Sequence, residues 1–143
     1  MFSFKKKKFK KKKFKKKKFK NKKTTTAIGR QGEDIAADWL SSHNYTIVTR
    51  NYRQRFGEVD IIARQDGWLV FIEVKTRSSA RFGSPLDSVT EKKQQQLSRI
   101  ANDYLSRNDA LDVPCRFDVV SVLLHGDRPP TVDVIVNAFE YIE

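Results

Sequence analysis

The pattern of apolar and polar positions predicts two helices and five strands. Apolar residues recur every three or four positions over two segments, which is the spacing of a helix with one buried face. Over five shorter segments they alternate with polar residues or run continuously between turn-forming residues, as in β-strands. We expect helices over residues 28–42 and 87–107, and strands over residues 45–52, 58–64, 68–76, 116–124 and 131–136.

The strand over residues 68–76 is expected in the middle of a sheet, because it is apolar on both faces. Asp66-Gly67 is a typical hairpin turn and pairs this strand with the preceding one. The long helix, with Asp87 or Ser88 as its expected N-cap, then leads to the fourth strand. A meander of three strands followed by a crossover helix predicts an α/β fold, in which helices pack against a mixed sheet.

Charged residues continue the buried stripe of this central strand. Leu69 and Phe71 are typical core residues, and Glu73 and Lys75 follow on the same face because strand side chains alternate. Asp60 lies on the preceding strand, where hairpin pairing can place it beside Glu73. A buried charge is costly unless it is paired or coordinated, so this position calls for a chemical explanation.

The acids Asp60 and Glu73 have the chemistry of a divalent-cation site. Two adjacent carboxylates repel each other and raise a pKa unless a cation lies between them. Their oxygens, together with a backbone carbonyl and waters, suit Mg²⁺ or Mn²⁺. The ammonium of Lys75 can hold a water against a bound phosphate, as metal-assisted phosphodiester hydrolysis requires. The alternative is a salt bridge between Lys75 and one acid at the solvated end of the sheet.

Two charged residues on the predicted helices, Lys93 and Glu33, have two interpretations each. Lys93 falls on the buried stripe of the long helix, where its stem packs in the core or where it, or the adjacent Gln94, is directed at the carboxylate end of the sheet. Glu33 begins an apolar face of the first helix. It is either a first-turn acid favoured by the helix dipole or a further carboxylate at the metal site. Gly32 lies in the first turns of this helix, where helix propensity alone would not place it.

The charge is divided unevenly along the 143 residues. Residues 1–23 hold fifteen lysines and no acid, so the net charge of +12 becomes −3 for residues 24–143. Phenylalanines recur every five residues in this basic tail, a step that forms no stripe on a helix, and we expect the tail to be disordered. It is either a cationic arm that binds phosphate backbones or a dispensable low-complexity extension. The second interpretation requires less, since compositional runs are weak evidence of function.

Several classes of protein are excluded by what the sequence lacks. The single Cys115 leaves no internal disulfide framework or thiolate zinc site, and His43 and His125 leave no histidine-rich metal cluster. The longest apolar run is too short to span a bilayer, and no apolar region of a secretory signal follows the basic start. A glycine-rich phosphate loop with its lysine is also missing. We therefore expect a cytoplasmic protein that does not act at a membrane.

Eight short blocks stand in order between residues 28 and 140: Gly29-Arg30-Gln31-Gly32-Glu33, Asn51-Tyr52-Arg53, Gly57-Glu58-Val59-Asp60, Glu73-Val74-Lys75-Thr76-Arg77, Phe82-Gly83-Ser84-Pro85, Lys93-Gln94, Arg116-Phe117-Asp118-Val119-Val120 and Asn137-Ala138-Phe139. Together they resemble the YraN-like family of small bacterial proteins, regarded as predicted nucleases. That family is similar to the PD-(D/E)xK nucleases, the restriction-endonuclease-like superfamily, and especially to archaeal Holliday-junction resolvases. Val59 stands here where the superfamily pattern has proline.

The resemblance implies a restriction-endonuclease-like mixed sheet with an αβββαβ core over residues 28–143, preceded by a tail and linker over residues 1–27. It implies that Asp60, Glu73 and Glu33 bind Mg²⁺ or Mn²⁺ and that Lys75 is the catalytic lysine. Related resolvases work as dimers, which leaves room for a homodimer, although the sequence shows no dimer surface.

These observations favour a metal-dependent endonuclease that acts on DNA, including branched or damaged DNA. Candidate contacts to the nucleic acid flank the acidic strands or lie on the long helix: Arg53, Arg55, Arg77, Arg81, Lys93 and Gln94. The alternative reading of each arginine is an ordinary solvated loop residue. Two other classes stay open: a nucleic-acid-binding module of the same fold without turnover, and a structural adaptor.

Overall fold

The structure, a computed structural model, describes residues 26–79 and 83–143. The basic tail and Arg81 lie outside the described residues, so the expectations for them stay predictions. Gly32–Glu143 forms one compact unit that contains the whole sheet. Residues 26–31 belong to a separate unit and are helical.

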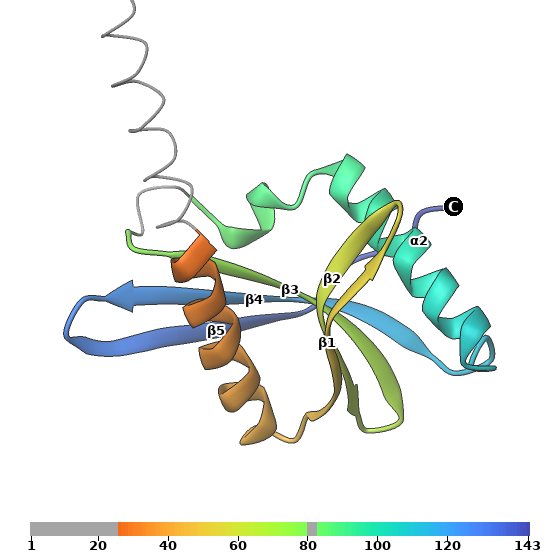
Figure 1. Ribbon diagram of the computed structural model, residues 1–143, viewed down its shortest axis with the longest axis horizontal. Helices are drawn as coiled ribbons and strands as arrows, with labels where there is room; N and C mark the ends of the chain where they lie inside the picture. Colours follow the sequence, from red (N-terminus) through yellow and green to blue (C-terminus); the bar gives the residue numbers. More distant parts are fainter. Residues whose placement is uncertain (1–25, 80–82) are drawn as a thin grey trace, which may run out of the picture. The chain divides into compact units, whose positions relative to one another are not determined.

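A single sheet of five strands confirms the predicted α/β architecture (Figure 1). The strands are β1 Thr46–Gln54, β2 Gly57–Gln65, β3 Trp68–Arg77, β4 Cys115–His125 and β5 Arg128–Phe139, and they lie side by side in that order. β3 pairs with β4 in parallel, and every other neighbouring pair is antiparallel. The parallel pair needs a crossover, and α2 (Glu91–Arg107) supplies it. The fold is consistent with the restriction-endonuclease-like arrangement that the resemblance implies.

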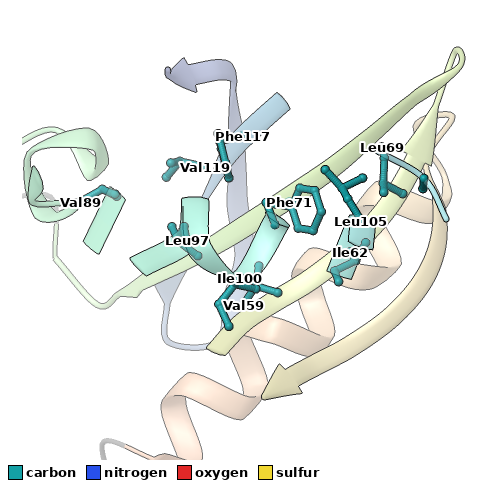
Figure 2. Close-up of a cluster of buried hydrophobic side chains, with 12 residues drawn as sticks. Val59, Ile62, Leu69, Phe71, Val89, Leu97, Ile100, Leu105, Phe117 and Val119 are labelled. Atoms are coloured by element: carbon teal, nitrogen blue, oxygen red, sulfur yellow. The ribbon is translucent and has the colours of Figure 1, made fainter. Parts of the chain in front are cut away.

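Two layers of apolar side chains cover the two faces of the sheet. On one face, Leu97 and Ile100 of α2 gather with Phe71 of β3 and Val59 of β2 (Figure 2). On the other face lie the helical residues 32–41, which contribute Ala36, Ala37 and Leu40. β3 supplies Leu69 and Phe71 to the first layer and Val70 and Ile72 to the second, which confirms its central place in the sheet.

The β2–β3 hairpin forms as predicted. Asp66 and Gly67 have φ values of 48° and 82°, and positive φ at both central residues is the geometry of a tight hairpin turn. Strict alternation fails further back along β2, because Val59 and Ile62 both join the layer under α2 although they stand three positions apart. This irregularity lies next to Asp60 and therefore matters for the site.

The long helix is shorter than predicted, and the prediction of its N-cap was wrong. Pro85–Ser88 forms a separate 3-10 turn, in which Asp87 accepts a hydrogen bond from the Ser84 N–H. Thr90 caps α2 instead, since its hydroxyl accepts a hydrogen bond from the Lys93 N–H at 3.2 Å. Two capping sequences compete here within seven residues, and the periodicity of apolar residues does not distinguish them.

Other element boundaries also differ from the expectation, and β5 differs most. The first helix already includes residues 26 and 27. β5 begins at Arg128, before the expected start at residue 131, and therefore includes two prolines. Proline is compatible with β5 because this strand lies at the edge of the sheet, where a missing N–H need not break a ladder. Within residues 26–79 and 83–143, every helix falls short of the length and apolar character that a membrane span requires.

Candidate active site

The site begins where β2 and β3 separate. Their pairing runs from Gln65 and Trp68 to Ile61 and Ile72, and Asp60 is the next residue of β2. The Val74 N–H of β3 donates a hydrogen bond of 2.7 Å to Asp60 Oδ2. A side-chain carboxylate thus takes the position of a main-chain acceptor, which holds Asp60 at the end of the ladder and next to Glu73.

Glu73 is a buried acid with two lysines around it. Its exposed fraction is 6%, and it lies on the α2 face of β3. Lys75 Nζ is 3.5 Å from Oε1, and Lys93 Nζ of α2 is 3.7 Å from Oε2. The second distance is an ion-pair contact but too long for a hydrogen bond, and Glu73 Oε2 accepts no hydrogen bond from the described residues. A buried carboxylate oxygen without a donor is rare, and a bound cation would satisfy it.

The two carboxyl groups are harder to ionise than usual. Burial raises the pKa of Glu73 to about 7, with a further contribution from the negative charge of Asp60, while Lys93 and Lys75 act in the opposite direction. Burial also raises the pKa of Asp60, and the Val74 N–H and Lys93 partly offset it. The two lysines therefore do not fully compensate the acids, and the site favours additional positive charge.

Glu33 joins this cluster from the first helix. Burial raises the pKa of its carboxyl group, and the charge of Asp60 raises it further. The Asn51 side chain forms a hydrogen bond with Glu33 that stabilises its ionised form. Gly32, one residue earlier, brings the helix against β3, because a Cβ atom there would collide with the Thr76 side chain. Glu33 is thus held near Asp60 and is not a first-turn acid, since residues 26–41 are helical.

A divalent cation fits the chemistry of these donors, although they are not assembled as a set of three. Across the described ranges, no three His, Cys, Asp or Glu side chains come together as a metal-binding group. Mg²⁺ is usually held by one or two carboxylates, with water and substrate phosphates as its other ligands. Asp60 and Glu73, with the undonated Oε2 of Glu73, meet that requirement. A metal-binding role of Glu33 stays a prediction.

The predicted nucleic-acid contacts fall into two groups. Arg53 is exposed and pairs with Glu58 at 2.8 Å, and the negative charge of Glu58 acts on Asp60. The exposed Arg55 follows in the β1–β2 turn. Lys93 lies at the site itself. The other two contact backbone: Arg77 donates to the Gly83 carbonyl at 2.6 Å, and Gln94 Nε2 donates to the Val89 carbonyl at 3.0 Å. The structure thus brings Lys93, and not Gln94, to the carboxylates.

Some site residues received no role from the sequence pattern. Asn51, which supports Glu33, adopts a positive φ of 53°, and nothing in the strand pattern marks this conformation. Thr76 is the residue that the first helix approaches at Gly32. The sequence did indicate a close contact at this point of the helix, because helix propensity disfavours glycine there.

Comparison with known proteins gives a consistent result. The profile of the uncharacterised protein family UPF0102 matches residues 32–122, which include every residue of the site. A UPF0102 protein of Geobacter sulfurreducens is 47% identical over 113 residues, which cover 79% of this chain and 88% of that protein. UPF0102 proteins of Symbiobacterium thermophilum and Nitrosomonas europaea are 46% and 45% identical over 112 residues, which cover 78% of this chain and 95% and 92% of those proteins. The chain therefore belongs to UPF0102, the YraN family.

Proposed function

We propose that this protein is a metal-dependent endonuclease that hydrolyses phosphodiester bonds in DNA. One observation carries the proposal: the buried Glu73 and the half-buried Asp60 lie next to each other where two strands separate, with raised pKa values and an undonated oxygen on Glu73. Such an arrangement destabilises the fold unless a positive charge compensates the carboxylates, and a bound divalent cation would supply that charge. Acids with raised pKa values are typical of functional sites.

Each residue has a distinct role in this proposal. Asp60 and Glu73 would hold Mg²⁺ or Mn²⁺, which when bound would activate a water and polarise the phosphate. Lys75, whose ammonium is 3.5 Å from Glu73 Oε1, would hold the attacking water and stabilise the charge that develops on the phosphate. Glu33 would add negative charge beside Asp60, in a position that Asn51 supports.

DNA as the substrate, including branched or damaged DNA, rests on the resemblance to Holliday-junction resolvases. A homodimer and a cytoplasmic location belong to the same proposal.

Cleavage of supercoiled plasmid and of four-way-junction DNA by the full chain, with Mg²⁺ or Mn²⁺, tests the proposal. We expect Asp60→Asn and Lys75→Ala each to lower the rate by about 10²-fold or more, the usual effect of removing one charge-stabilising group. Asp133→Asn is the matched control, because Asp133 is an exposed acid on β5, far along the sheet order from β2. Cleavage by both Asp60→Asn and Lys75→Ala at the wild-type rate would contradict this mechanism.

One observation favours a second candidate, a nucleic-acid-binding module without turnover. The part of the chain that the structure describes brings no three potential ligands together around a cation. This candidate predicts binding of DNA with no cleavage at any concentration of Mg²⁺ or Mn²⁺, so the same assay separates the two.

A further inference from the structure

Two adjoining cavities lie between the β1–β2 turn and α2. Their volumes are about 440 and 450 Å³, and Phe56, Lys93 and Gln96 line both of them. The first extends along α2 to Lys92 and Arg99, and the second extends over the turn to Arg55. We call the two cavities together the Phe56 groove. Figure 1 shows the tip of the β1–β2 hairpin reaching the helix α2.

Close contacts fix the shape of the Phe56 groove. Gln96 Nε2 donates a hydrogen bond of 2.9 Å to the Phe56 carbonyl, which ties the helix to the turn. A Cβ atom at Gly57 would displace the Gln96 side chain from this position, and the φ of 151° at Gly57 also favours glycine. The Arg99 guanidinium lies 4.6 Å from the centre of the Phe56 ring, a distance typical of a cation–π contact. These contacts within the chain therefore hold both sides of the groove in place.

The charge of the Phe56 groove is opposite to that of the rest of the domain. Residues 24–143 have a net charge of −3, yet the described residues that line the cavity along α2 include Lys92, Lys93 and Arg99 and no acid. The one acid of the second cavity, Glu58, is already paired with an arginine. Among the described residues, neither Arg55 nor Lys92 takes part in an ion pair. Free cations in a preformed groove attract a polyanion.

Lys93 connects the Phe56 groove to the candidate active site. Its side chain lines both cavities, and its ammonium is 3.7 Å from Glu73 Oε2. We propose that the Phe56 groove binds the phosphate backbone of a nucleic-acid strand and leads it to Asp60 and Glu73. The inference rests on the proposed function, and it adds Lys92 to the contacts that the sequence suggested.

Recognition in this groove is directed at phosphates. Its cationic side chains, the ammonium groups of Lys92 and Lys93 and the guanidinium of Arg55, match phosphate oxygens, which carry no sequence information. Gln96 is occupied by the Phe56 carbonyl. Binding should therefore be independent of sequence and steeply dependent on salt.

Fluorescence anisotropy of labelled duplex DNA with the full chain in EDTA, at several salt concentrations, tests the inference. The test variant is Arg55→Ala with Lys92→Ala, and the control is Arg64→Ala with Arg128→Ala. All four residues are exposed, and Arg64 lies on β2 at the end opposite to Asp60. Both double variants lose two positive charges and keep the whole basic tail, so the contribution of the tail is the same in each.

We expect the slope of log affinity against log salt to fall in magnitude by about two in the test variant and to stay near the wild-type value in the control. The loss should be equal for two unrelated DNA sequences. Equal slopes in the two double variants would overturn the inference, as would poly-glutamate that binds as tightly as DNA and loses affinity in the same way. EDTA prevents cleavage, so this experiment measures binding alone. A protein that shows the expected slopes here but does not cleave DNA with Mg²⁺ or Mn²⁺ would refute the nuclease proposal and still support DNA binding in the Phe56 groove.

Discussion

Among single residues, Glu73 carries the largest consequence of burial. Glu73 is 6% exposed, and the two ammonium groups at 3.5 and 3.7 Å do not restore the solvation that its carboxyl group loses. The pKa of about 7 expresses this balance, and it means that Glu73 changes its charge within the physiological range. A bound cation would shift the balance toward the ionised form.

This pKa predicts how stability depends on pH. The carboxyl group binds its proton more tightly in the folded chain, with a pKa of about 7, than in the unfolded chain, with 4.5. Folding is therefore favoured by protonated Glu73, and this contribution is lost as the pH rises from about 5 through 7. Urea unfolding in EDTA should show that the free energy of unfolding of wild type, minus that of Glu73→Gln, is smaller at pH 8 than at pH 5. A difference that stays constant between the two pH values would contradict the burial of this group.

The candidate site was predictable residue by residue only where strand alternation governs it. Glu73 and Lys75 lie where the alternation from Leu69 and Phe71 places them, because β3 is regular. Asp60 reaches Glu73 although the alternation on β2 is interrupted beside it. The support of Glu33 by Asn51 was not predictable, since it depends on one residue with positive φ and on a helix distant in sequence.

At the scale of elements, the first helix and β3 are joined by a contact that requires glycine. Gly32 allows the helix to approach Thr76, one residue after Lys75. The approach places Glu33, on the same helix, close enough to Asp60 for their charges to interact. Because the first helix packs so closely against β3, a displacement of this helix at Gly32 would also move Glu33 relative to Asp60.

Gly32→Ala should therefore destabilise the protein, although alanine favours a helix. We expect the free energy of unfolding to fall by about 1–3 kcal/mol, the usual cost of overpacking, as measured by urea denaturation. Gly29→Ala is the control, because a Cβ atom there meets no heavy atom within 4 Å in the described part of the chain. If both substitutions stabilise the protein to the same extent, the helix does not lie against Thr76.

Element types and order followed from periodicity, but element ends did not. The N-cap of α2 was misplaced because Ser84 and Thr90 both have capping sequences, and the buried Val89 lies between the two helical turns and not within the long helix. β5 was predicted too short because its prolines are acceptable only at an edge, and edge position is a property of the whole sheet.

At the scale of the whole molecule, the sheet gathers residues from four elements at one end. β2 brings Asp60, β3 brings Glu73 and Lys75, α2 brings Lys93, and the first helix brings Glu33. The meander and the crossover that create this meeting point followed from the sequence, because the apolar β3 had to be central. The Phe56 groove did not, since its cations come from a turn and from an exposed helix face that show no periodic pattern.

The central claim is that Asp60 and Glu73 together hold a divalent cation. The basic tail contains no acid, so it adds no carboxylate ligand in a test with the full chain. The pH should be 8, where ionised Glu73 predominates because its pKa is about 7.

Titration of the full chain with Mn²⁺ at pH 8, followed by electron paramagnetic resonance of the free ion, tests this claim most directly. We expect wild type and Asp133→Asn to bind Mn²⁺ alike, and Asp60→Asn and Glu73→Gln to bind it about tenfold or more weakly. Equal binding by all four proteins, or no binding by wild type even with DNA present, would contradict the account.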